Sequence, residues 1–93
     1  MASSLPIILL AEFLGTFLLM LSVLASGGNP LVIGATLAFI VFLTGGISGA
    51  AVNPALAAGL WYMGTLTQSK AIAYIVVEIL GGLAAAYAYK IVG

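Results

Sequence analysis

The side chain best suited to chemistry in this sequence is the amide of Asn53, which follows an uncharged, glycine-rich segment, residues 45–52. Its oxygen can cap a helix that starts at Pro54, because proline is preset for the first helical position. Its NH2 group then stays free to donate hydrogen bonds to a passing oxygen atom. The helix continues through Ala55 and is broken after Tyr62, so it is only about 12 Å long. This pattern predicts a site that orients water or a hydroxyl group.

Two acids, Glu12 and Glu78, each fall inside a long apolar stretch. A buried carboxylate is costly unless it is paired, hydrogen-bonded or protonated. We expect both to support neighbouring backbone rather than to react. An alternative remains open, in which a small dual-topology, proton-coupled transporter uses Glu12 as its titrating group.

The composition places the chain in a membrane. Its 93 residues are 65% hydrophobic and 4% charged, with a mean hydropathy of +1.37, so a soluble fold would lack the polar surface to cover itself. The net charge is zero, which leaves no basic face for nucleic acid. Cysteine and histidine are absent, which removes thiol chemistry and the commonest transition-metal ligands. We predict an integral, multi-pass membrane protein that needs no cofactor or metal and is not an enzyme.

The apolar stretches predict an all-α fold. A membrane-spanning helix needs roughly 20 apolar residues, and residues 5–25 and 71–92 qualify directly. Residues 31–45 give a second helix, and residues 46–62 give a loop and a half-helix too short to cross. Non-helical backbone is tolerated inside a membrane only where protein buries it or where it lines a water-filled cavity. The local sequence leaves one alternative open, in which this segment is a loop at the membrane surface. We treat residues 1–93 as one domain of three transmembrane helices and one re-entrant half-helix.

Aromatic residues mark the expected membrane–water interfaces. Trp61 and Tyr62 end the half-helix, Tyr74 is nearby, and Tyr87 and Tyr89 fall near the end of the last helix. We expect them to form two interfacial belts.

Small residues leave a third function open. Ala11 with Gly15, and Gly81 with Ala85, have the four-residue spacing that lets membrane helices approach closely. The chain could therefore be a non-conducting helical partner of another membrane protein. Such a partner gives no reason for an uncharged glycine loop, and a transporter gives none for the Asn-Pro-Ala triplet.

The segment Ser-Gly-Ala-Ala-Val-Asn-Pro-Ala, residues 48–55, resembles the Ser-Gly-x-x-x-Asn-Pro-Ala signature of the major intrinsic protein family, the aquaporins and glycerol facilitators. Residues 11–17 are similar to that family's first-helix motif, and residues 74–81 follow the pattern of its third helix. The resemblance implies a channel for water or small neutral solutes such as glycerol. Family members contain two inverted halves with one such half-helix each, whereas this chain has one. It therefore looks like one half of an aquaporin-like inverted repeat.

The resemblance also implies roles for individual residues. Glu12 accepts hydrogen bonds from the loop backbone, and Glu78, where a glutamine is common, does similar work. The triplet and the carbonyls before it contact the solute. These pore residues are Asn53, Pro54, Ala55, Gly49, Ala50 and Ala51.

The expected constriction of the pore departs from the family pattern. Full-length members usually carry an arginine directly after the second triplet, and Leu56 holds that place here. Ile33 and Val41 fall at two other constriction positions, and both are aliphatic. Ala51 replaces a histidine common in the family's first half. We expect an apolar and relatively wide constriction.

The missing half predicts the assembly. An odd number of spans puts the two termini on opposite faces, so a second copy can complete the pore only if it inserts upside down. Lys70 precedes the last helix and Lys90 ends it, which leaves almost no bias in orientation. We expect an antiparallel homodimer with dual topology, in which the two Asn53 side chains meet at the midplane. By resemblance, four such dimers, or eight chains, could cluster in the bilayer.

Overall fold

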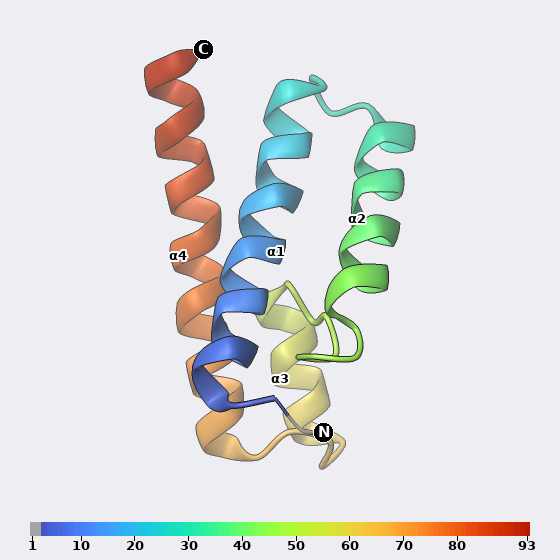
Figure 1. The fold of residues 1–93 in the computed structure, drawn as a ribbon, viewed down its shortest axis with the longest axis vertical. Coiled ribbons are helices and arrows are strands. Elements are labelled where there is room, and N and C mark those ends of the chain that lie inside the picture. Colours follow the sequence, from blue (N-terminus) through green and yellow to red (C-terminus); the bar gives the residue numbers. More distant parts are fainter. Residues whose placement is uncertain (1–2) are drawn as a thin grey trace.

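The computed structural model describes residues 3–93, which form an all-helical arrangement (Figure 1). The helices in this part of the chain are α1 (Leu5–Ala25), α2 (Pro30–Thr44), α3 (Pro54–Tyr62) and α4 (Gln68–Val92). α1 and α4 run side by side in the same direction, so that α1 begins and α4 ends at opposite ends of the molecule (Figure 1).

Two of the helices are long and apolar enough to cross a membrane: α1 with 21 residues and α4 with 25. α2 has 15 residues and α3 has nine, which correspond to about 22 Å and about 14 Å of rise. Neither matches a hydrocarbon core of about 30 Å. α2 lies along the upper part of α1, and α3 starts near mid-height and runs to the lower end (Figure 1). Together they cover the length that α1 covers alone.

α2 and α3 begin with the same pair of residues, an asparagine followed by a proline. Asn29 Oδ1 accepts a hydrogen bond from the N–H of Leu31 at 2.9 Å, and Asn53 Oδ1 accepts one from the N–H of Ala55 at 2.8 Å. The proline occupies the first helical position. The N–H of any residue at that position has no partner within the helix, so the absence of an N–H in proline costs no hydrogen bond. Both starts are therefore set by local sequence.

α4 begins before the predicted start at residue 71. Thr67 Oγ1 accepts a hydrogen bond from the N–H of Lys70 at 3.3 Å, and the helix starts at Gln68. The prediction counted from the first apolar residue, but the capping side chain determines where the helix begins.

α1 and α4 pack closely because α4 has a glycine at the contact. A Cβ atom at Gly81 would lie 2.5 Å from the carbonyl oxygen of Phe13 on α1. Ala85, on the same face of α4, is completely buried. On another side of α1, a Cβ atom at Gly15 would lie 2.6 Å from Cγ1 of Val52. These small residues allow close packing within the chain.

Tyr74 does not lie in an interfacial belt, and this prediction is wrong. Its side chain is 2% exposed and packs with Ile8, Ala51 and Ala57 in the core between α1, α3 and α4. The residue lies on the same buried face of α4 as Glu78, one turn earlier. The position of Tyr74 along α4 suggested that it lies at the membrane interface. The structure shows that its side chain is on the face of α4 that packs into the core.

α2 is the least covered of the helices. Among its residues only Ile40 is buried. Within the described part of the chain, α2 contacts α1 but neither α3 nor α4. Leu31 and Phe42 are more than four-fifths exposed. An apolar surface of this kind needs lipid or another helix against it.

The Gly81 contact can be tested with a single methyl group. Gly81→Ala should lower the free energy of unfolding in detergent micelles by about 1–3 kcal/mol, because the new Cβ would collide with the α1 backbone. Gly82→Ala is the matched control, since its Cβ would meet only a Thr16 methyl group at 4.0 Å. Thermal unfolding followed by circular dichroism measures both. Equal stability of the two variants would show that α1 and α4 do not cross at Gly81.

Candidate functional site

The loop between α2 and α3 has an unusual backbone. Ala50 and Val52 have φ angles of +51° and +41°, in the left-handed region that side chains with a Cβ disfavour. Such residues cost on the order of 1–3 kcal/mol each unless the surrounding structure fixes them. Both side chains are buried, at 7% and 2% exposure. The loop is therefore held in place by its contacts rather than by local preference.

The Glu12 carboxylate provides the main contact. It is completely buried and accepts hydrogen bonds from the Ser48 hydroxyl at 2.5 Å and from the N–H of Ala51 at 3.2 Å, both at Oε2. The N–H of Val52 donates to Oε1 at 2.8 Å. Hydrogen bonds to an ionised acceptor are stronger than neutral ones. One side chain of α1 thus fixes the Ser48 hydroxyl and the backbone amides of Ala51 and Val52.

Two further residues hold the loop, and the sequence analysis did not identify them as functional. The Tyr74 hydroxyl donates to the Ser48 carbonyl at 2.6 Å. The Ser48 hydroxyl, besides donating to Glu12, accepts from the N–H of Ala50 at 3.2 Å. Two signals pointed to them: Ser48 begins the signature segment, and Tyr74 lies one helical turn before Glu78.

Glu78, on α4, is also buried, at 1% exposure. The resemblance implied that it also accepts hydrogen bonds from the loop. Neither of its carboxyl oxygens does so within residues 3–93. The groups that face it are the Glu12 carboxyl and the Asn53 backbone amide. Glu78 therefore lies beside Glu12, but the loop donates no hydrogen bond to its carboxyl group.

Asn53 is exposed at the start of α3. Its side-chain oxygen is used by the cap, and within the described residues its NH2 group donates no hydrogen bond. No backbone hydrogen bond in this part of the chain ends on the carbonyl of Gly49, Ala50 or Ala51. The site thus combines a free amide donor with free carbonyl acceptors.

An open hollow of about 550 Å³ lies beside the loop residues Gly49, Ala50 and Ala51, whereas Asn53 and Pro54 do not line it. It brings Leu56 together with the loop residues, whereas Ile33 and Val41 on α2 do not line it. Since α2 and α3 make no contact, a single copy does not assemble the three constriction residues. The hollow is lined by Gly49, Ala50, Ala51, Ala55, Leu56, Gly59, Leu60 and Met63.

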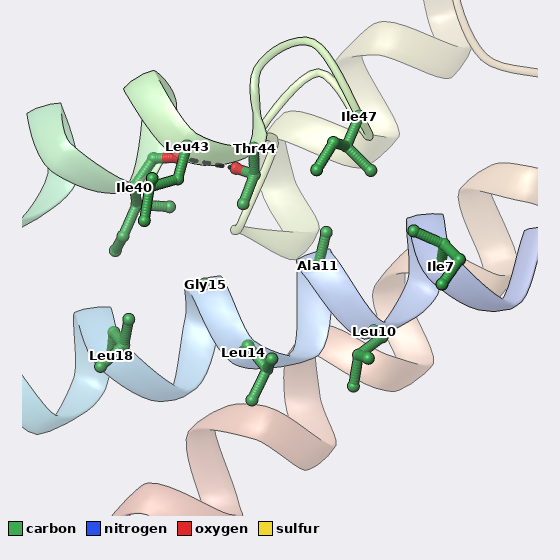
Figure 2. Close-up of a pocket in the computed structure, with 10 residues that line it drawn as sticks. All are labelled: Ile7, Leu10, Ala11, Leu14, Gly15, Leu18, Ile40, Leu43, Thr44 and Ile47. Atoms are coloured by element: carbon green, nitrogen blue, oxygen red, sulfur yellow. Dashed lines mark hydrogen bonds between the residues drawn. The ribbon is translucent and has the colours of Figure 1, made fainter. Parts of the chain in front are cut away.

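A second hollow, of about 410 Å³, is an apolar groove between α1 and α2 (Figure 2). Its one polar side chain, Thr44, uses its hydroxyl proton to donate to the carbonyl of Ile40 at 2.8 Å (Figure 2). The groove suits another apolar surface rather than a polar solute. It is lined by Ile7, Leu10, Ala11, Leu14, Gly15, Leu18, Ile40, Leu43, Thr44 and Ile47.

The long apolar helices α1 and α4 and the short capped helix α3 beside the loop are typical of a helical integral membrane protein. The profile of the family described as major intrinsic protein matches residues 28–92, so the chain belongs to the major intrinsic protein family. Members of this family are membrane channels and not enzymes. The resemblance drawn from the signature segment is confirmed.

Two curated relatives show the same relationship. The glycerol uptake facilitator protein-like 6 of Lactiplantibacillus plantarum is 38% identical over 91 residues, covering 87% of this chain and 41% of the relative. Aquaporin Z of Photorhabdus laumondii is 37% identical over 98 residues, covering 89% of this chain and 42% of the relative. The chain thus spans about two-fifths of the length of these relatives. No solved structure matches it.

The role of Tyr74 can be tested by removing one oxygen atom. Tyr74→Phe should lower the free energy of unfolding by about 1 kcal/mol, because the buried Ser48 carbonyl loses its donor. It should also speed hydrogen exchange at the loop amides. Tyr87→Phe is the control, because Tyr87 is 68% exposed. If the two variants exchange and unfold alike, the hydroxyl contact does not hold the loop.

Proposed function

We propose that this chain is one half of a transmembrane channel for water and small neutral solutes, and that two copies in opposite orientations form one pore. In this proposal residues 1–93 form three transmembrane helices, which are α1, α4 and the shorter α2, and one re-entrant half-helix, α3. The observation that carries it is the state of Asn53. Its oxygen is occupied by the cap of α3, and within the described residues its NH2 group and the backbone carbonyls of Gly49, Ala50 and Ala51 remain free.

The electrostatics of α3 favour neutral solutes. The first N–H groups of a helix are unpaired, and its dipole places about half a positive elementary charge at the start. Two such ends facing each other at the midplane would disfavour any cation. A water molecule or hydroxyl group can instead accept a hydrogen bond from Asn53 and donate to a loop carbonyl.

A second, inverted copy accounts for what one copy leaves incomplete. α2 is exposed along most of its surface, and the groove between α1 and α2 is apolar. Ile33 lies near the start of α2 and Val41 near its end, about 12 Å apart along the axis. In an antiparallel pair, Ile33 of one copy can approach Val41 and Leu56 of the other at each mouth. Four such pairs could cluster further, giving eight chains.

The constriction formed in this way is aliphatic. Leu56 is 52% exposed and borders the hollow beside the loop, and Val41 is 47% exposed. Without a charged side chain, selection rests on width and on the groups around Asn53. One relative is named for glycerol uptake and another is named an aquaporin. We propose that this pore passes water and also solutes of glycerol size.

The geometry gives little support to a proton-coupled transporter that uses Glu12. Such a group must be reached from each side of the membrane in turn and must exchange its proton. Glu12 is completely buried, and three donors from the loop occupy its oxygens. Its protonation would release the loop rather than move a substrate.

Replacing Asn53 tests the channel directly. Asn53→Leu should abolish osmotic water flux in liposomes that contain the purified chain, because it removes both the cap and the free donor. Asn29→Leu is the matched control, since Asn29 caps α2 in the same way but lies in the turn after α1. Asn53→Ser keeps a capping oxygen and should fold normally with reduced flux. Stopped-flow light scattering measures all of these.

Unchanged flux in Asn53→Leu would exclude the proposed pore. Equal loss in Asn29→Leu would instead point to a general failure to fold.

The antiparallel arrangement can be tested through membrane orientation. Gln68→Lys with Ser69→Lys adds charge beside Lys70 and should fix one orientation, because lysines near a span bias its topology. Val92→Lys with Gly93→Lys adds charge beside Lys90 and should fix the opposite one. All four positions are exposed. Each double variant alone should lose flux, and co-expression should restore it. Full flux from one fixed orientation would require a parallel assembly or a different partner.

A further inference from the structure

Two carboxyl groups lie next to each other inside this protein. Glu12 on α1 and Glu78 on α4 are 0% and 1% exposed, and they face each other across the helix contact. They differ in their partners. Glu12 receives three hydrogen bonds from the loop, and Glu78 receives none from the described residues.

No other group in residues 3–93 can balance a second negative charge at this point. Among the titratable side chains only Glu12, Tyr74 and Glu78 are buried. The Tyr74 hydroxyl is used by the Ser48 carbonyl. α2, α3 and the loop between them carry no charged side chain, and both lysines are exposed. The Asn53 backbone amide faces Glu78 as the one nearby donor, but it forms no hydrogen bond with the carboxyl group.

Two carboxylates in such surroundings cannot both be ionised, because like charges at close range in an apolar interior repel strongly. Glu12 is the one suited to carry the charge, since both of its oxygens accept hydrogen bonds. Glu78 accepts no hydrogen bond from the described residues and is the one suited to carry a proton. A protonated carboxyl group is itself a donor.

We propose that Glu78 is protonated and donates a hydrogen bond to the Glu12 carboxylate, so that a shared proton completes the anchor of the pore loop. Glu78 is then a positioning residue that acts through Glu12. A glutamine would donate to Glu12 permanently through its NH2 group. A glutamic acid does so only while it holds the proton. When alkaline solvent takes this proton, two adjacent anions remain, and their repulsion disturbs the position in which Glu12 accepts hydrogen bonds from the loop amides.

The first test needs no transport. The chain has only two acidic side chains, so the infrared C=O stretch of a buried carboxylic acid can be assigned without ambiguity. Purified chain at neutral pH should show this band, with the downshift expected in heavy water, and Glu78→Gln should lose it completely. Absence of the band in the native chain, or its persistence in Glu78→Gln, would overturn the proposal.

The second test rests on the proposed channel function. Water flux of the native chain in liposomes should fall several-fold from neutral to alkaline pH, and flux of Glu78→Gln should stay constant over the same range. An alkaline loss that is equal in both, or flux of the native chain that does not change with pH, would overturn the proposal. If native liposomes show no flux at any pH, the channel function fails, and the infrared band still decides whether Glu78 holds the proton.

Discussion

The hydrogen bonds between the Glu12 carboxylate and the loop are the interaction on which the rest of this structure depends. Two loop residues, Ala50 and Val52, adopt left-handed conformations, and both of their side chains are buried. One carboxylate satisfies the N–H groups of Ala51 and Val52 and orients Ser48. Because both carboxylate oxygens of Glu12 accept hydrogen bonds, this acid inside an apolar helix stabilises the structure.

Small residues allow Glu12 to reach the loop. Gly15 lies one turn after Glu12 and leaves room for Val52 against α1, and Gly81 lets α4 approach the α1 backbone. Larger side chains at either position would separate the elements that share Glu12. The approach of α4 also brings Tyr74 to the loop and Glu78 to Glu12. The close packing of the helices and the hydrogen bonds of the loop therefore depend on the same helix contacts.

The start of α3 is the part of this arrangement that the proposed transport uses. Asn53 and Pro54 begin a helix near mid-height of the molecule, with the free groups of the loop beside it (Figure 1). One copy presents these groups at an open surface, and α2 remains exposed. The proposed second copy would enclose this surface and supply an opposing helix start, as inverted repeats do in other membrane channels and transporters.

The sequence by itself determined the class of protein, the family, and the capped starts of α2 and α3, because hydrophobicity and caps such as Asn29 and Asn53 act over a few residues. It also indicated that Glu12 has a supporting role, through the family motif. The tertiary structure decided the rest. Tyr74 is in the core and not at the interface, since its environment depends on which face of α4 meets α1. The unsatisfied state of Glu78 was equally out of reach, because it depends on where three separate elements place their donors around one carboxylate.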